Sequence, residues 1–102
     1  MAHITETVFL TTGVELNGKA QREVVIRIGI IQDSIDTEQE CEGKGLLVKS
    51  LNLLKKQIIK FGSMPANEIT VDLLGALTET DLDLLREAGE FLKKKALWQK
   101  RD

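Results

Sequence analysis

The chain has 102 residues, of which 42% are hydrophobic and 29% charged, a composition typical of globular rather than disordered proteins. This length supports one modest core, so we expect a single domain over residues 1–102. The formal net charge of -2 argues against a general attraction to nucleic acid or to an acidic membrane. No apolar run is long enough for a transmembrane helix, and the N-terminus lacks the basic start of a secretory signal. The only cysteine, Cys41, cannot form an internal disulfide, so a cytoplasmic location is the simplest prediction.

Residues 5–30 are predicted to form an antiparallel β-hairpin. Two runs rich in Val, Ile, Thr and Phe flank Asn17-Gly18, a pair typical of two-residue hairpin turns. A regular ladder from this turn would place Val8 and Val24 on opposite faces of the hairpin. One extra residue in the first strand returns both to the same face, because a one-residue slip inverts every side chain. We therefore predict a bulge at Thr12-Gly13, where glycine permits a positive φ.

The helical part is predicted over residues 34–97. Gly43 and Gly45 should interrupt it early, because glycine is a poor helix former. An apolar stripe at alternating steps of four and three residues follows, which is typical of an amphipathic helix. The members of this stripe are Leu47, Leu51, Leu54, Ile58 and Phe61. Gly62 is the expected C-terminal cap of this helix, and residues 63–69 are predicted to be a loop.

Two further helices are expected in the last third of the chain. Thr70 is a candidate N-cap for a short helix that ends at Gly75. Thr78 followed by Asp81 resembles a capping box at the start of a second long helix. The sequence thus predicts an α+β fold, in which an N-terminal antiparallel hairpin, with or without a third short strand, packs against about three helices.

No set of residues has the spacing of a catalytic, metal or cofactor site, so a protein without enzymatic activity is predicted. The acidic segment 33–42 lacks the residue order of a calcium loop and is interpreted as a solvated helix start. Asp81 and Asp83 could form an acid–base pair, but helix capping explains Asp81 more simply. Cys41 lies among carboxylates that disfavour a nucleophilic thiolate, and the only histidine, His3, is distant in sequence.

The long amphipathic helix carries more apolar residues than one face requires. Leu46, Leu53 and Ile59 widen its apolar arc to more than half of its circumference. An apolar surface of this kind in so small a domain indicates a protein partner or a homo-oligomer.

The C-terminal segment has the opposite charge to the remainder of the chain. Residues 93–102 carry five positive side chains and one negative, so the first 92 residues carry a net -6. Lys93, Lys94, Lys95 and Trp98 are candidates for contacts with an acidic protein surface or a phosphate backbone. In the favoured alternative, the lysines complement the helix dipole and Trp98 packs on the core, so nucleic acid is disfavoured as a ligand.

The order of these parts resembles the tail assembly proteins, or tail assembly chaperones, of Mu-like and related tailed phages. The family's hairpin strand is matched by Gly18, Arg22, Glu23, Val24, Ile26 and Arg27. Its helical ending is matched by Ile69, Thr70, Leu73, Leu77, Asp81 and Leu82. The resemblance covers residues 8–97, although the lysine cluster and the glycine-interrupted acidic segment depart from the family pattern.

The resemblance implies a protein-binding adaptor of the bacterial host cytoplasm, encoded by a phage or prophage. Such proteins bind the tape-measure protein during tail assembly, and tail-tube subunits are a second implied partner. In this family a longer product is often made by translational frameshifting, and the protein is absent from the finished particle. Two alternatives stay open: a small nucleic-acid-binding regulator that uses the basic C-terminal helix, and a structural tail component that remains in the virion.

Overall fold

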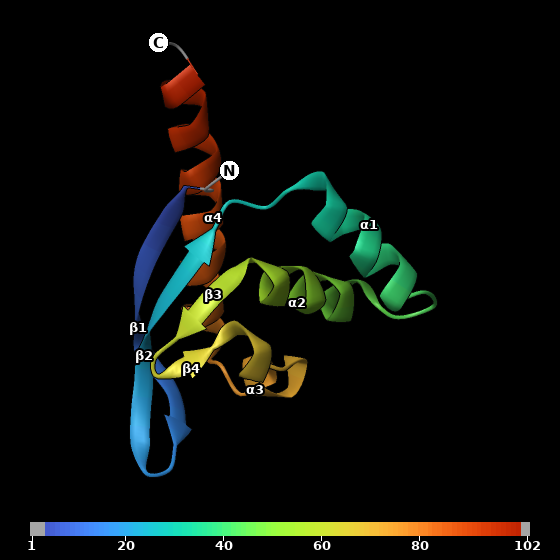
Figure 1. Ribbon diagram of the computed structural model, residues 1–102. Coiled ribbons are helices and arrows are strands. Elements are labelled where there is room, and N and C mark those ends of the chain that lie inside the picture. The colour runs from blue at the N-terminus through green and yellow to red at the C-terminus, as the bar shows by residue number, and fades with distance from the viewer. Residues whose placement is uncertain (1–3, 101–102) are drawn as a thin grey trace.

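The structure, a computed structural model, describes residues 4–100 and the side chains of residues 4–98 (Figure 1). In chain order its elements are β1 (Thr5–Leu16), β2 (Lys19–Arg27), α1 (Ile31–Glu40), α2 (Leu46–Gln57), β3 (Ile58–Phe61), β4 (Met64–Pro65), the 3-10 helix η1 (Ala66–Glu68), α3 (Val71–Gly75) and α4 (Glu79–Lys100). The predicted α+β fold with an N-terminal hairpin is confirmed, and the chain switches from α1 to α2 at the predicted glycines. No described helix is both long and apolar enough to cross a membrane.

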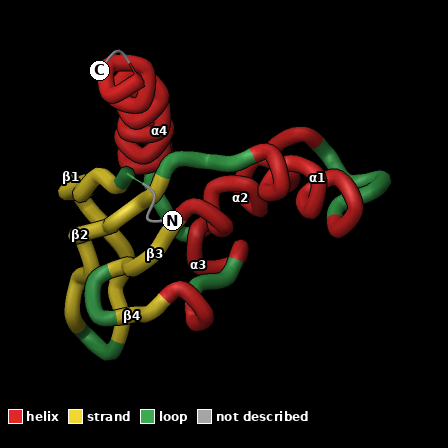
Figure 2. The backbone as a smooth tube through the Cα atoms, turned by 45° about the horizontal axis from the view of Figure 1, so that its top comes forward, coloured by secondary structure: helices red, strands yellow, loops and turns green. Residues whose placement is uncertain are grey.

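The strands form one antiparallel sheet in the order β1-β2-β3-β4. α4 packs on β1 and β2, and its C-terminal end extends past the sheet (Figure 1). α1 packs on α2 and α2 packs on α3, so these three helices form a group, which lies beside β3 and β4 (Figure 2). The molecule is therefore elongated, with extents of 46 × 33 × 24 Å.

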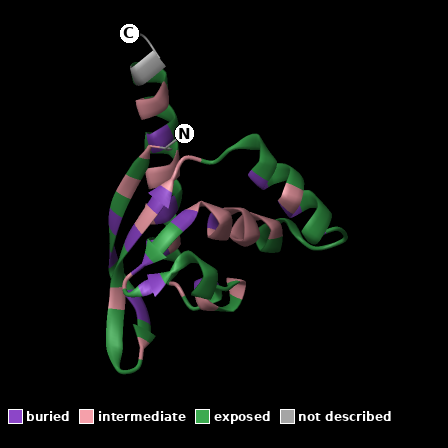
Figure 3. Cartoon of the chain, viewed as in Figure 1, coloured by how far each residue is buried: buried purple, intermediate pink, exposed green. Residues whose placement is uncertain are grey.

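The core lies where the inner face of the sheet meets α2, α3 and α4, and α1 contributes little to it (Figure 3). Aliphatic side chains dominate this core, as a chain with three Phe and no Tyr requires. Its buried members are Val8, Leu10, Val14, Val24, Ile26, Leu54, Ile58, Phe61, Met64, Ile69, Leu74, Leu85 and Leu92.

The bulge predicted at Thr12-Gly13 is confirmed, and it is larger than one residue. Between Phe9 and Val14, β1 advances five positions while β2 advances two, which leaves three extra residues in β1. The φ of Gly13 is 72°, in the region that favours glycine. Because three is an odd number, Val8 still lies opposite Val24 on the buried face.

The prediction that one helix continues to Phe61 is wrong. α2 ends at Gln57, and β3 pairs with the open edge of β2. Ile59 is an extra residue in β3, because its neighbours pair with adjacent residues of β2. Because of this bulge, Ile58 and Phe61 are both buried although they lie three residues apart. A three-residue spacing also fits a helix, so the sequence pattern predicted a helix here.

Three related predictions are also wrong for this reason. Gly62, with φ of 59°, turns the chain between β3 and β4 instead of capping a helix. The segment 63–69 contains β4 and η1 and is not only a loop. Ile59 lies in a strand, so it does not widen the apolar arc of a helix.

The helix starts were predicted more accurately. The Thr70 side chain accepts a hydrogen bond from the Leu73 N–H, which confirms it as the N-cap of α3. The Thr78 hydroxyl oxygen likewise accepts from the Asp81 N–H at 3.2 Å. The reciprocal half of the predicted capping box is wrong, because the Asp81 carboxylate is directed at β1.

Asp81 joins α4 to the bulge of β1. Its Oδ1 accepts from the N–H and the hydroxyl of Thr11, both at 2.7 Å, and its Oδ2 accepts from the N–H groups of Thr12 and Gly13 at 3.1 and 2.8 Å. Burial by itself raises the pKa of Asp81, but these hydrogen bonds outweigh it and lower the pKa to about 2. The fully buried carboxylate therefore fixes the position of α4 on the sheet.

Candidate protein-binding surfaces

A hollow of about 600 Å³ lies between α2 and the middle of α4. Leu53 lines it from α2, and Phe91, Lys93 and Lys94 line it from α4. Three of the residues predicted to bind a partner, Leu53, Lys93 and Lys94, therefore lie around one hollow, although sequence analysis placed them in two separate surfaces.

A second hollow of about 450 Å³ adjoins the first and lies among α2, α3 and α4. It is lined mainly by leucines, which are Leu47, Leu51, Leu74, Leu77 and Leu82. Arg86 lines both hollows and donates a long hydrogen bond of 3.5 Å to the Ser50 hydroxyl oxygen. We call the two hollows together the α2–α4 groove.

Gln57, the last residue of α2, approaches two glycines at the groove. A Cβ at Gly29 would lie 3.0 Å from Nε2 of Gln57, which is tighter than an ordinary contact. A Cβ at Gly89 of α4 would lie 4.0 Å from Oε1 of Gln57, which is ordinary van der Waals contact. The groove thus has room for a methyl group at Gly89.

We expect Gly89→Ala to raise the free energy of unfolding by about 0.5–1 kcal/mol, because alanine is the better helix former. Gly13→Ala is the matched control with the opposite sign. Its Cβ would lie 2.2 Å from the Gln21 carbonyl oxygen at a φ of 72°, so stability should fall by about 2 kcal/mol or more. Urea denaturation measures the free energy of unfolding of both variants. A Gly89→Ala variant less stable than the wild type would contradict the conclusion that a methyl group fits beside Gln57.

The basic end of α4 lies beyond the groove. Trp98 is 59% exposed and packs edge to face on Phe91, with ring centroids 6.2 Å apart. The interpretation that Trp98 packs its indole on the core is therefore wrong. Lys95 is half-buried and Lys93 pairs with Glu90 at 3.3 Å in an exposed contact. Trp98 and Lys95 line neither hollow, although Trp98 packs on Phe91, which lines the first.

The remaining two candidates do not join either site. Leu46 is 85% exposed at the first turn of α2, and Ile59 is 42% exposed in the bulge of β3. Neither residue lines the two hollows. Of the predicted apolar arc, Leu46 and Leu53 lie on α2, but Ile59 lies in β3, so the arc through all three residues is wrong at Ile59.

α1 presents an exposed apolar surface that sequence analysis missed. Ile31 is 77% exposed and Ile35 is 45% exposed, one helical turn apart. The sequence assigned residues up to 30 to the hairpin and began the helix after them, so this i, i+4 pair was not considered as part of a helix. The four-residue spacing of Ile31 and Ile35 was the signal from which an exposed apolar helix face could have been predicted.

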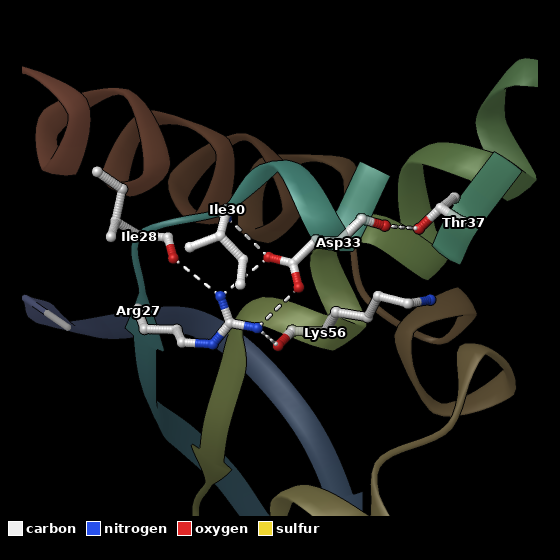
Figure 4. Close-up of polar contacts among 6 residues, drawn as sticks. All are labelled: Arg27, Ile28, Ile30, Asp33, Thr37 and Lys56. Carbon is white, nitrogen blue, oxygen red and sulfur yellow. Dashed lines mark hydrogen bonds and ion pairs between the residues drawn. The ribbon is translucent and has the colours of Figure 1, made fainter. Parts of the chain in front are cut away.

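Arg27 fixes α1 and the end of α2 to the sheet (Figure 4). Its Nη1 and Nη2 donate to the two carboxylate oxygens of Asp33, each at 2.9 Å. Nη2 also donates to the Lys56 carbonyl oxygen at 2.8 Å, and Nη1 donates to the Ile28 carbonyl oxygen at 2.9 Å. Since these partners lie at the start of α1 and in the last turn of α2, one guanidinium sets the position of both helices.

Asp33 is a buried member of this network and not part of a solvated helix start, which corrects the interpretation of the acidic segment. Its carboxylate also accepts from the Ile30 N–H at 3.0 Å. The hydrogen bonds from Arg27 hold the pKa of Asp33 below its ordinary value of 3.8, against the opposing effect of burial. The same pairing raises the pKa of Arg27.

The other candidate chemical groups show no assembled site in the described part of the chain. Cys41 is a free, buried cysteine. Among the described side chains, no three His, Cys, Asp or Glu residues gather where they could hold a metal ion. His3 lies outside the described residues.

Comparison of the chain with protein-family profiles, with curated proteins and with solved structures found no match.

Proposed function

We propose that this protein is a non-enzymatic adaptor that binds an amphipathic helix of a partner protein in the α2–α4 groove. The observation that supports the proposal is the groove itself, whose two adjoining hollows of about 600 and 450 Å³ are lined by leucines from several helices. Several of these leucines are partly exposed, and covering them with an apolar helix face would remove that surface from water.

Charged residues at the two hollows supply selectivity for such a helix. The first hollow has a small positive excess, because Arg86, Lys93 and Lys94 outnumber Glu87 and Glu90. The second has a small negative excess, because Glu79 and Asp83 outnumber Arg86. A bound helix places a partial negative charge at its C-terminus and a partial positive charge at its N-terminus. We expect the partner helix to lie with its C-terminal end nearer the lysines and its N-terminal end nearer the carboxylates.

The resemblance to tail assembly chaperones suggests the partner. In that role, the groove would cover apolar helical surface of a tape-measure protein until tail-tube subunits replace the chaperone. The protein would act in the host cytoplasm, from a phage or prophage gene.

The test is binding of a helical fragment of the tape-measure protein encoded by the same genome, measured by isothermal titration calorimetry. We expect a dissociation constant of roughly micromolar order. Leu53→Ser should weaken binding by about tenfold or more, because Leu53 lines the groove. Ile59→Ser is the matched control and should leave the affinity unchanged, because Ile59 lies outside the groove.

Absence of binding at about 100 µM, or equal weakening by both variants, would count against the proposal. A separate titration with duplex DNA tests the nucleic-acid alternative, which the exposed Trp98 beside Lys94 and Lys95 favours. Salt-dependent DNA binding that is lost on charge reversal of Lys93, Lys94 and Lys95 would support that alternative instead.

A further inference from the structure

Two exposed faces of opposite charge lie on different elements of this chain. The first, which we call the α1 face, consists of Ile31, Ile35 and Glu38, at positions i, i+4 and i+7 of α1. All three residues are exposed, and the buried residues Asp33 and Thr37 lie on the other side of the helix. The α1 face thus combines an apolar half with an acidic half.

The second face, the α4 end, consists of Phe91, Lys94 and Trp98, at positions i, i+3 and i+7 of α4. Phe91 is 40% exposed, Trp98 is 59% exposed, and Lys94 is exposed between them. The buried residue Leu92 faces the sheet from the opposite side of this helix. The α4 end thus combines two aromatic rings with a cation.

The two faces are complementary in chemistry. The isoleucines of the α1 face match the aromatic rings of the α4 end in apolar character. Glu38, which forms a largely exposed ion pair with Lys49 in its own chain, has the opposite charge to Lys94. The charges of the whole chain are divided in the same way: the first 92 residues, which include the α1 face, carry a net -6, and residues 93–102 carry a net +4. Apolar faces bordered by complementary charges are characteristic of protein interfaces.

The faces of one molecule cannot meet each other. α1 is held on the sheet by the Arg27–Asp33 pair, and ion pairs of Glu38 with Lys49 and of Glu40 with Lys56 join it to α2. Figures 1 and 2 show α1 at the far end of the group formed by α1, α2 and α3, and the C-terminal end of α4 on another side of the molecule. The contact is therefore available only between two molecules.

We propose that the α1 face of one copy docks on the α4 end of a second copy. This contact is heterologous, because it joins two different faces, and it leaves one α1 face and one α4 end free in each pair of copies. Such a contact continues into open chains or closes into rings of copies. Each contact involves one short helix face, so the association is weak and depends on protein concentration.

The experiment is sedimentation velocity of the full chain from about 5 to about 500 µM, at low and high salt. We expect the wild type to form species larger than 11.4 kDa as the concentration rises, and less of them at high salt. Trp98→Ser removes the more exposed ring of the α4 end, and Ile31→Ser removes the most exposed apolar side chain of the α1 face. Each variant alone should associate about tenfold or more weakly than the wild type.

A mixture of the two variants gives the decisive result. The Trp98→Ser chain keeps its α1 face and the Ile31→Ser chain keeps its α4 end, so one intact contact forms between them. The mixture should therefore contain a 1:1 heterodimer that cannot extend further. Phe9→Ser is the matched control, because Phe9 is 69% exposed on β1 and belongs to neither face, and it should associate like the wild type.

A wild-type chain that remains monomeric at about 500 µM would overturn the proposal. So would wild-type association by either single variant, or a mixture without the heterodimer. All variants change exposed side chains, and circular dichroism checks that they are folded. The readouts require no other protein, and none of the three substituted residues lines the α2–α4 groove, so failure here is distinct from failure of the proposed adaptor function.

Discussion

Asp81→Ala is expected to lower the free energy of unfolding by about 3 kcal/mol, because it leaves three backbone N–H groups and one hydroxyl of the β1 bulge without their acceptor. Asp81→Asn should recover less than half of this loss. Its amide nitrogen would present a donor to N–H groups that need an acceptor. Urea denaturation at neutral pH measures both variants.

Asp83→Ala is the matched control, because Asp83 is exposed two residues further along α4. Its effect should stay within about 0.5 kcal/mol. A similar loss in both variants would show that the acidic start of the helix matters in general and that the specific bonds to the bulge do not.

The acid sensitivity of the protein should depend on Asp81. Its pKa is about 2 in the folded chain against an ordinary 3.8, so the unfolded chain binds the proton more tightly. The corresponding stabilisation, about 2 kcal/mol, is present above pH 3.8 and disappears as the pH falls towards 2. Between pH 3.8 and 2, the free energy of unfolding should fall less steeply with decreasing pH for Asp81→Ala than for the wild type. Denaturation measured at several pH values gives both slopes, and equal slopes would contradict the assignment.

Arg27→Ala is expected to destabilise the protein by about 2–3 kcal/mol, because it leaves the buried Asp33 carboxylate without its bidentate partner. The loss should concentrate in α1 and the end of α2, which this side chain fixes to the sheet. Hydrogen exchange should therefore accelerate in Ile31–Glu40 more than in β1. Arg27→Lys should recover only part of the lost stability, since an ammonium group cannot form the paired hydrogen bonds of a guanidinium group.

Lys49→Ala provides the control for this second prediction. Lys49 also joins α1 to α2, through Glu38, but 68% of the Glu38 side chain is exposed. We expect a loss below about 1 kcal/mol and little change in exchange of α1. Uniform acceleration across the whole chain on Arg27→Ala would indicate global destabilisation and no specific role in positioning α1.

Much of the fold follows from local patterns. The turn residues Asn17 and Gly18 adopt φ of 53° and 80°, as a hairpin turn of this composition requires. The bulge was predictable because only an odd number of extra residues brings Val8 and Val24 to one face. The caps at Thr70 and Thr78 depend on a side chain and an N–H three residues apart, which sequence displays directly.

The candidate binding surfaces were less accessible to sequence reasoning. Exposure depends on which elements cover a residue, so Leu53, Lys93 and Lys94 could be named individually but not assigned to one groove. Ile31 and Ile35 were missed because the boundary between strand and helix was misplaced. The sequence could not show whether Trp98 packs on the core or faces solvent. Trp98 is exposed because the C-terminal end of α4 extends past the sheet (Figure 1).

The sequence by itself determined the elements whose signals lie within a few residues: the hairpin, its bulge, the glycine interruption and the starts of α3 and α4. Tertiary structure decided two features that depend on distant partners. Ile58–Phe61 became a strand because the edge of β2 offers hydrogen bonds to it, and a bulged strand can bury residues at a helical spacing. Asp81 became a link to Thr11, 70 residues earlier, because the bulge of β1 presents N–H groups that only the folded chain brings to the start of α4.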